Sequence, residues 1–241
     1  MGANTVNRVA RPKWRSYLLL SRVSNLPTVW TNVLAAAVVA VTQPTVADVV
    51  QLSCAASLFY VGGMFLNDAC DRRFDAERRP DRPIPAGDVS VGEAFAIGFG
   101  LMALGEAWLA IAGFSSALMW GAALASTIAL YDFWHKGNPI GPLIMGACRG
   151  LVYVLAAMAV TGTVTAPLIA AALAMSVYVV AVTGVAKTGP RFGWTIPWLI
   201  AGISLVDAGV IAASGGVLAL SLIAATGFVL TLGLQRVVPG T

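Results

Sequence analysis

The sequence predicts an all-α integral membrane protein, folded as a polytopic bundle of transmembrane helices. The first observation is composition: of 241 residues, 58% are hydrophobic and 11% are charged, and the mean hydropathy is +0.81. A soluble domain carries more charge on its surface. The second observation is that the apolar residues form runs near the roughly 20 residues that span a bilayer as a helix. These runs are too long and continuous for the strands of a membrane barrel.

Eight apolar segments account for most of the chain, and turn-forming residues separate them. Gly-Pro, Asn-Pro and Gly-Gly pairs in the connectors are typical of turns. We therefore expect one transmembrane domain over residues 1–241. The predicted segments are Asn25–Val41, Val46–Leu66, Val89–Ile111, Ser115–Tyr131, Ile140–Val160, Pro167–Val185, Trp194–Ala213 and Gly216–Leu234.

The basic residues of the connectors alternate along the chain and test this topology. The connectors after the first, third, fifth and seventh segments contain no Lys or Arg. Those after the second, fourth and sixth contain Arg72, Arg73, Arg78, Arg79, Arg82, Lys136, Lys187 and Arg191. Because basic residues are retained on the cytosolic side, the pattern predicts a multi-pass protein of the cytoplasmic (inner) membrane with a cytosolic N-terminus. It also explains the net charge of +4 without nucleic acid as a partner.

The residues before the first apolar run do not form a secretory signal. Several arginines are spread through them, and no short apolar core with a small-residue cleavage site follows. We expect an interfacial amphipathic lead-in, with Trp14 and Tyr17 near the lipid headgroups.

Three acidic residues follow the second apolar segment at helical spacing. Asp68, Asp71 and Asp75 are three and four residues apart, and Asn67 lies one turn before Asp71. On a continuing helix the three carboxylates share one face and repel one another unless a cation lies among them. Mg²⁺ prefers such oxygen ligands and commonly shares them with substrate phosphates. The pattern predicts a Mg²⁺ site for a diphosphate, with Arg72, Arg79 and Arg82 as further phosphate ligands. A solvated loop in which acids and arginines merely pair is the alternative.

Other polar residues lie within or beside the apolar segments, where ionisable groups are expensive and usually paired or functional. Arg149 either lines a cavity and contacts phosphate or forms an ion pair with Asp207. The single histidine, His135, is expected to be a hydrogen-bonded residue at the interface. Glu106 is expected to reach toward the outer interface.

Two elements of the sequence, the first of which contains the acidic motif, resemble the UbiA superfamily of intramembrane prenyltransferases. The first element is Asn67-Asp-x-x-Asp71-x-x-x-Asp75 with the Arg-Pro-x-Arg-Pro-Ile-Pro-x-Gly stretch at 79–87. The second element is Tyr131-Asp-Phe-Trp-His-Lys136. Together with the segment that follows it, this element is most similar to the EboC-like branch of the superfamily. The resemblance implies a helical bundle whose central cavity opens to lipid, and transfer of a prenyl group from a prenyl diphosphate to an acceptor.

The resemblance also implies roles for individual residues. Asp68, Asp71 and Asp75 would bind Mg²⁺. The residues assigned to the diphosphate are Asn25, Asn67, Arg72, Arg79, Arg82, Lys136 and Arg149, although Asn25 can equally be a helix cap. The residues assigned to catalysis are Lys136, Tyr131, Arg72 and Lys187.

This sequence departs from the family pattern in two places. Family members usually carry a second acidic motif between the sixth and seventh helices, whereas the connector here, from Val185 to Arg191, contains no acid. We expect Lys187 and Arg191 either to place positive charge on the diphosphate directly or to act only as topology anchors. The family usually has nine helices, and this chain supports eight. We expect either that the chain is truncated after Gln235-Arg236 or that it belongs to a shorter branch.

The function predicted from the sequence is a Mg²⁺-dependent prenyltransferase whose acceptor is unidentified. A terpene cyclase of the same superfamily is one alternative. A non-catalytic lipid-binding or transport component that lost the second acidic motif is another. A CDP-alcohol phosphotransferase is excluded, because its motif needs Asp-Gly-x-x-Ala-Arg where this chain has Asp71-Arg72-Arg73.

Overall fold

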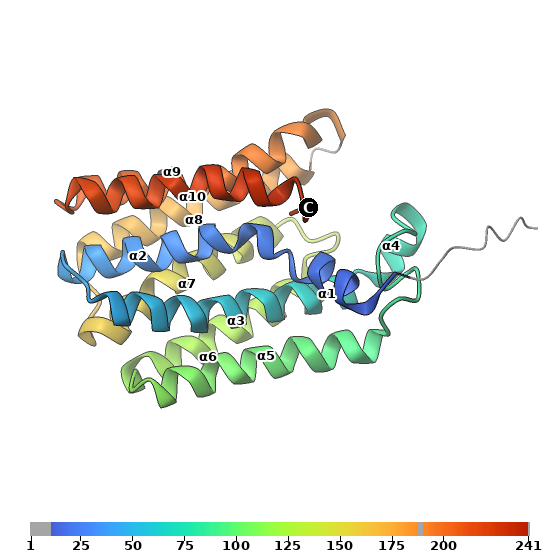
Figure 1. The fold of residues 1–241 in the computed structure, drawn as a ribbon, viewed down its shortest axis with the longest axis horizontal. Helices are drawn as coiled ribbons and strands as arrows, with labels where there is room; N and C mark the ends of the chain where they lie inside the picture. Colours follow the sequence, from blue (N-terminus) through green and yellow to red (C-terminus); the bar gives the residue numbers. More distant parts are fainter. Residues whose placement is uncertain (1–10, 188–189, 241) are drawn as a thin grey trace, which may run out of the picture.

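The computed structural model describes residues 11–187 and 190–240, with side chains left undescribed at 190–192. Within these ranges the chain is helical and contains no strand. Eight long helices lie side by side in an elongated bundle (Figure 1). They are α2 (Leu26–Val41), α3 (Val46–Cys70), α5 (Val91–Ile111), α6 (Leu118–Trp134), α7 (Gly141–Thr161), α8 (Ala166–Lys187), α9 (Ile196–Ala213) and α10 (Leu218–Gln235).

Each predicted apolar segment overlaps one of these helices, with ends that differ by up to four residues, so the predicted fold class is confirmed. Seven stretches of the described chain are long and apolar enough to cross a membrane. The remaining long helix, α6, has 17 residues, and α2, with 16, belongs to a longer apolar stretch that runs from Lys13 to Val41. The protein is therefore a multi-pass membrane protein.

Local sequence signals fix the ends of several helices. Thr45 and Ser90 are N-caps, and their side chains accept hydrogen bonds from the backbone amides of Asp48 and Glu93. Gly162 ends α7 in the left-handed conformation, with φ at 69°. The turn residues that separate the apolar segments in the sequence therefore also terminate the helices.

Two short helices lie outside the long ones, at the end of the bundle that carries the acidic motif. They are α1 (Lys13–Ser21), which lies beside the ends of α3 and α5, and α4 (Arg72–Arg78), which Figure 1 shows projecting past them. The hydroxyl of Tyr17 and the ammonium of Lys13 both contact Glu93 at the start of α5, the latter at 2.9 Å. The predicted lead-in is thus a helix anchored to the bundle. Three short 3₁₀ segments complete the fold, at Val23–Asn25, Ser115–Ala117 and Pro190–Thr195.

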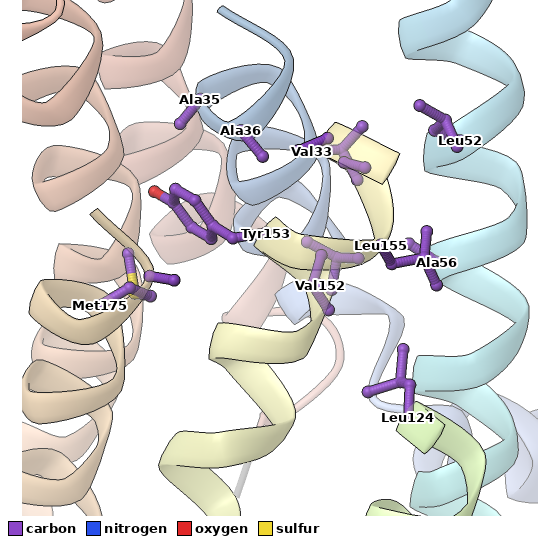
Figure 2. Packing of buried hydrophobic residues seen from close by; sticks show 14 of the residues in the cluster. Val33, Ala35, Ala36, Leu52, Ala56, Leu124, Val152, Tyr153, Leu155 and Met175 are labelled. Carbon is purple, nitrogen blue, oxygen red and sulfur yellow. The ribbon is translucent and has the colours of Figure 1, made fainter. Parts of the chain in front are cut away.

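Helix α7 lies at the centre of the core. Its residues Val152, Tyr153 and Leu155 are buried and pack among side chains of α2, α3, α6 and α8 (Figure 2). On its other side, Gly146 and Gly150 allow α7 to approach Ser176 of α8 closely. Small residues are the usual means by which membrane helices pack tightly. This close approach is what the Gly146-x-x-x-Gly150 spacing suggests.

A second close helix pair joins α3 to α5 and supports the acidic motif. A Cβ added at Gly62 would lie 2.7 Å from the carbonyl oxygen of Gly98. That contact is with backbone, so it cannot be relieved by a side-chain rotation. The spacing of α3 and α5 therefore depends on glycine at position 62.

We expect Gly62→Ala to destabilise the protein by about 1–3 kcal/mol, because it overpacks a close backbone contact. Gly100→Ala on α5 is the matched control, since an added Cβ there meets nothing within 4 Å. Alanine is the better helix former by up to about 1 kcal/mol, so the control should be neutral or more stable. Thermal unfolding of both variants in the same detergent measures the difference. Equal midpoints would show that the α3–α5 contact is not close in solution.

Candidate active site

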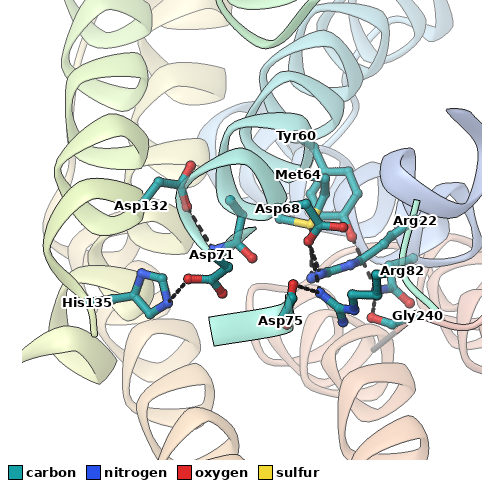
Figure 3. A network of polar contacts seen from close by, with 12 residues as sticks. Arg22, Tyr60, Met64, Asp68, Asp71, Asp75, Arg82, Asp132, His135 and Gly240 are labelled. Atoms are coloured by element: carbon teal, nitrogen blue, oxygen red, sulfur yellow. Dashed lines mark hydrogen bonds and ion pairs between the residues drawn. The ribbon is translucent and has the colours of Figure 1, made fainter. Parts of the chain in front are cut away.

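The acidic motif lies where α3 ends. Asp68 is in the last turn of α3, Asp71 is the junction residue and Asp75 belongs to α4. All three are buried, with 5%, 7% and 2% of their surface exposed. Buried carboxylates need partners, and each has at least one basic partner in Figure 3 or within contact distance.

Asp68 and Asp75 share one guanidinium. Nη1 of Arg82 lies 3.1 Å from Oδ1 of Asp68 and 3.0 Å from Oδ2 of Asp75. Nη2 of Arg22 lies 2.6 Å from the same oxygen of Asp68. The Arg-Pro stretch after α4 therefore folds back onto the motif, and Arg82 lies in the predicted diphosphate region.

Asp71 faces the opposite side, toward the end of α6. Its carboxylate lies 2.9 Å from Nζ of Lys136 and 3.4 Å from Nε2 of His135. Burial acts to raise the pKa of Asp71, but the hydrogen bonds from His135 and Lys136 outweigh it and lower that pKa. Lys136 also lies over the ring of Phe74, 3.9 Å from its centre. The predicted Lys136 is thereby joined to the motif.

The expectation that all three carboxylates share one face is therefore wrong for this arrangement. Asp71 points toward the end of α6, where it pairs with Lys136, whereas Asp68 and Asp75 pair with the arginines on the other side (Figure 3). Among the described residues, no three acidic, histidine or cysteine side chains are grouped closely enough to hold a metal ion. The physical reason is that paired cations already neutralise the motif.

Arg22 is a site residue that the sequence analysis missed. It was assigned to the basic lead-in, yet its guanidinium binds Asp68 and lies 3.6 Å from the sulfur of Met64. Its backbone is left-handed, with φ at 45°. Such a conformation costs a non-glycine residue about 1 kcal/mol or more. The available signal was its position, one turn before the first transmembrane helix.

Asp132 is the second residue that the sequence analysis missed. Nδ2 of the predicted Asn67 donates to Oδ1 of Asp132 at 3.1 Å, which links α3 to α6. The element around it was interpreted through Tyr131 and Lys136 alone. Its signal was an acidic residue within an apolar segment, which is rare unless functional or paired.

The predicted residue Asn25 is buried and does not cap the helix that follows it. Its amide nitrogen donates to the hydroxyl of Tyr60 at 3.2 Å and to the carbonyl of Gly240 at 3.1 Å. Gln235 donates to the amide oxygen at 2.8 Å. Asn25 therefore links the 3₁₀ segment before α2 to α3 and to the end of α10. Gly240 is seen beside Arg22 and Arg82 in Figure 3.

Arg149 does not form the direct ion pair with Asp207 that the sequence suggested. Its guanidinium donates to Oδ1 of Asn32 at 2.8 Å and to Oγ1 of Thr28 at 3.0 Å. The amide of Asn32 donates in turn to both oxygens of Asp207, at 2.9 and 2.8 Å. Asp207 is fully buried and also accepts from Thr31 at 2.6 Å and from Tyr153 at 2.5 Å. An uncharged amide between the two charges satisfies both with short hydrogen bonds.

The remaining predicted residues lie around the motif without contacting its carboxylates in the described contacts. Arg72 donates to the carbonyl of Ala69 at 3.2 Å. The side chain of Arg79 is mostly exposed. The loss of hydration on its buried part, together with the charge of Arg82, lowers its pKa. Nζ of Lys187 donates to the carbonyl of Asn138 at 3.0 Å, in the connector between α6 and α7. The side chain of Arg191 lies outside the described residues. His135 is hydrogen-bonded through Nδ1 and the carbonyl of Tyr131, as expected.

A cavity of about 90 Å³ lies between α2, α3, α6 and α7. Its polar lining consists of Tyr60, Tyr131, Asp132 and Arg149. Its other walls are aliphatic and aromatic side chains, a sulfur and a thiol: Val29, Ala56, Phe59, Gly63, Met64, Leu124, Ile128, Met145, Cys148 and Val152. The predicted Tyr131 and Arg149 thus meet at one cavity, and α3 runs from that cavity into the acidic motif.

Fold and site together define a polytopic helical membrane protein with a buried acidic motif, paired with basic side chains, next to a largely apolar cavity. The model of the UbiA prenyltransferase family matches residues 25–187. The chain belongs to that family, as its acidic motif and its Tyr131–Lys136 element indicate.

Relatives with assigned activities match part of the chain. A 4-hydroxybenzoate octaprenyltransferase of Providencia stuartii is 27% identical over 149 residues, which cover 59% of this chain and 51% of that protein. A digeranylgeranylglyceryl phosphate synthase of Methanopyrus kandleri is 33% identical over 134 residues, which cover 52% of this chain and 46% of that protein. The chain thus matches about half the length of these relatives.

Solved structures share the fold over almost the whole chain. A UbiA homologue from Archaeoglobus fulgidus, bound to GPP and Mg²⁺, aligns with a TM-score of 0.59 at 16% identity. The alignment covers 92% of this chain and 86% of that one. At this identity the likeness establishes the fold.

We expect Asp207→Leu to destabilise the protein by about 3 kcal/mol or more. The change leaves the donors of Thr31, Asn32 and Tyr153 buried without an acceptor, and each orphaned group costs about 1–3 kcal/mol. Asp207→Asn keeps the shape and one acceptor oxygen, so its loss should be smaller. Chemical denaturation in mixed micelles gives both values. Equal stability of Asp207→Leu and the unmodified protein would show that the buried network does not hold α2, α7 and α9 together.

Proposed function

We propose that this chain transfers a prenyl group from a prenyl diphosphate to an acceptor within the membrane, in a Mg²⁺-dependent reaction. The observation that carries the proposal is that three buried carboxylates, with their basic partners, lie next to an apolar cavity. Met64 of the cavity lining contacts Arg22, and Asp132 of the lining is bonded to Asn67. A prenyl diphosphate has one highly charged end and one apolar tail, and this arrangement complements both. The activities named for the two relatives, both prenyl-transfer enzymes by name or family, support the same reaction class.

The residues of the acidic motif fit Mg²⁺ by their chemistry. Asp68, Asp71 and Asp75 offer only carboxylate oxygens, which are hard ligands. Oδ1 of Asp71 is buried, and its one contact among the described ion pairs is the long one of 3.4 Å with Nε2 of His135. For all three residues to hold Mg²⁺, Asp71 would have to turn from Lys136 and His135 toward Asp68 and Asp75. The ion would then supply the positive charge that makes carboxylates and a diphosphate compatible. The homologue from Archaeoglobus fulgidus contains GPP and Mg²⁺ together.

Basic side chains of this chain would bind and stabilise the diphosphate. Arg22 and Arg82 lie at the motif and present guanidinium groups suited to bidentate phosphate contacts. When the C–O bond of the prenyl diphosphate breaks, the leaving pyrophosphate takes the electron pair and gains charge. Lys136 lies at the motif to stabilise that growing charge.

The cavity would hold the prenyl group and keep water from the allylic cation. Its walls are largely apolar, and the rings of Tyr60 and Tyr131 line it. Aromatic faces attract a cation. The acceptor then captures the cation in a water-poor space.

A lipid diphosphate-binding protein without turnover is the second candidate function. It is favoured by one observation, the lack of acidic residues in the sequence between α8 and α9. Mg²⁺-dependent release of pyrophosphate from a set of prenyl diphosphates distinguishes the two. A terpene cyclase would release pyrophosphate without any added acceptor and would yield a cyclic product.

We further propose that the chain resides in the cytoplasmic membrane with its N-terminus in the cytosol. The basic residues Arg22, Arg82 and Lys136 gather at one end of the bundle, together with α1 and α4. The positive-inside rule assigns that end to the cytosol, where a soluble diphosphate headgroup is accessible.

Asp68→Ala and Asp71→Ala should each abolish Mg²⁺-dependent binding of geranylgeranyl diphosphate while the protein stays folded. Each change removes a carboxylate ligand of Mg²⁺ but leaves basic side chains that can still contact the diphosphate. Loss of Mg²⁺-dependent binding can therefore be distinguished from loss of the fold. Asp48→Asn, at the opposite end of α3, is the control and should bind as the unmodified protein does. Titration calorimetry with and without Mg²⁺ provides the measurement. Unfolding of both variants, with no Mg²⁺ response in the unmodified protein, would identify the motif as structural.

Lys136→Ala should reduce turnover by roughly two decades, because a charge-assisted contact to the leaving group contributes about 3 kcal/mol to the transition state. Lys187→Ala should have the smaller effect, since Lys187 contacts the Asn138 carbonyl whereas Lys136 contacts Asp71. Pyrophosphate release at saturating Mg²⁺ measures both. A larger loss in Lys187→Ala would assign the leaving-group charge to the connector after α8 instead.

A further inference from the structure

The residues that follow α10 form a turn that reaches the polar side chains before α2. Helix α10 stops at Gln235, and the backbone amide of Val238 donates to the carbonyl of Leu234 at 2.9 Å. Pro239 cannot continue this pattern, because it has no amide hydrogen and its ring fixes φ. Residues 236–240 therefore leave α10 as a short irregular segment, which we call the strap.

The strap is attached at Gly240, which is buried. The carbonyl oxygen of Gly240 accepts a hydrogen bond from Nδ2 of Asn25 at 3.1 Å. A Cβ added to this glycine would lie 2.5 Å from Oδ1 of the same asparagine, so the backbone packs directly against the amide. Arg236 and Val237 are exposed by contrast. The strap is thus anchored at one end and not along its length.

This attachment lies at the charged end of the candidate site. The backbone amide of Asn25 donates to the carbonyl of Arg22 at 3.0 Å, in the 3₁₀ turn before α2. The guanidinium of Arg22 in turn binds Asp68 at 2.6 Å. Figure 3 shows Gly240 beside Arg22 and Arg82. A backbone carbonyl, which can only accept hydrogen bonds, therefore lies next to the basic groups of the acidic motif.

The attached strap leaves one buried polar atom unsatisfied. Nε2 of Gln235 donates to Oδ1 of Asn25 at 2.8 Å, whereas Oε1 of Gln235 is buried and has no donor among the described residues. A buried acceptor without a donor costs free energy, because it has lost its water and gained nothing in return. Water that enters when the strap leaves can donate to this oxygen. Opening therefore recovers part of the free energy that the broken contacts cost.

We propose that the strap is an autoinhibitory segment, which blocks the diphosphate end of the site until the substrate displaces it. The proposal rests on the prenyl diphosphate binding proposed for this chain and adds its regulation. The Gly240 carbonyl and a phosphate oxygen are both hydrogen-bond acceptors, so they compete for the same donors. The phosphate oxygen is charged and forms the stronger bonds, including those to guanidinium groups. A diphosphate can therefore replace the strap, whereas a neutral lipid lacks the charge to do so.

Two released variants and one control test the strap. Gly240→Val places a branched side chain against Asn25, where even a Cβ is too close. A chain that ends at Val238 removes the attachment without adding a side chain, in case the first variant does not fold. Gly233→Ala is the matched control, because an added Cβ at this glycine of α10 meets nothing within 4 Å. Thermal unfolding midpoints show which variants are folded.

Titration calorimetry of the full chain in lipid nanodiscs, with geranyl diphosphate and Mg²⁺, gives the dissociation constants. A blocked site binds with an affinity reduced by the fraction of molecules that are open. We expect the dissociation constant to fall about three- to tenfold in both released variants, the factor that one net hydrogen bond supplies. The control should match the unmodified protein.

Hydrogen exchange provides a second readout on the unmodified protein. Displacement of the strap exposes the backbone at Gly240, so exchange of the peptide that contains this residue should become faster when geranyl diphosphate and Mg²⁺ are added. Slower exchange on binding would identify the segment as a lid that closes over the substrate, and would overturn the inference.

Equal or weaker binding by a folded released variant would also overturn the inference. So would an equal gain of affinity in Gly233→Ala, because the strap would then not be the cause. Binding by the released variants alone, with none by the unmodified protein, would support the inference. Failure of every chain to bind geranyl diphosphate with Mg²⁺ is a different result, which removes the proposed function and this inference with it.

Discussion

Charge compensation at the end of α3 is the constraint on which the rest of the site depends. Three carboxylates lie within eight residues and are buried, so each must be neutralised where the chain enters the membrane. The partners come from three separate regions: Arg22 before α2, Arg82 after α4, and His135 with Lys136 at the end of α6. One local cluster of charge thereby ties the N-terminal segment, the long connector and the middle of the chain to one point.

A second polar system crosses the apolar core without joining the first. Arg149, Asn32 and Asp207 form a chain of hydrogen bonds through α7, α2 and α9. In a lipid environment such a network is held in place because the alternative is an unsatisfied polar group in hydrocarbon. Arg149 also lines the cavity, so this network holds one polar residue of an otherwise largely apolar wall.

The sequence predicted most of the fold because its signals are local. Segment length and hydropathy determine a membrane helix almost alone, and Thr45, Ser90 and Gly162 stop or start helices through contacts with their own neighbours. Asp68, Asp71, Asp75 and Lys136 were predictable for a related reason, since their spacing and their place after a helix are visible in the chain.

The missed features depend on contacts between distant segments. Arg22 and Asp68 are 46 positions apart, and Asn67 and Asp132 are 65 apart, so no spacing rule links them. The predicted pairing of Arg149 with Asp207 identified two connected residues but not Asn32 between them, because an amide carries no charge pattern to detect. The orientation of Asp71 was likewise set by α6, which lies far along the chain.

The shared guanidinium of Arg82 has a consequence for how this site tolerates change. Loss of Arg82 alone would leave Asp75 without its basic partner, whereas Asp68 would keep Arg22, and loss of Arg82 together with Asp75 would leave neither carboxylate unpaired. The effects of substitutions at these positions are therefore expected to be strongly non-additive, as is usual for residues with a common partner. Homologous chains should exchange Arg82 and Asp75 as a unit. Such epistasis would constrain the order in which mutations accumulate here, even between sequences that share the fold.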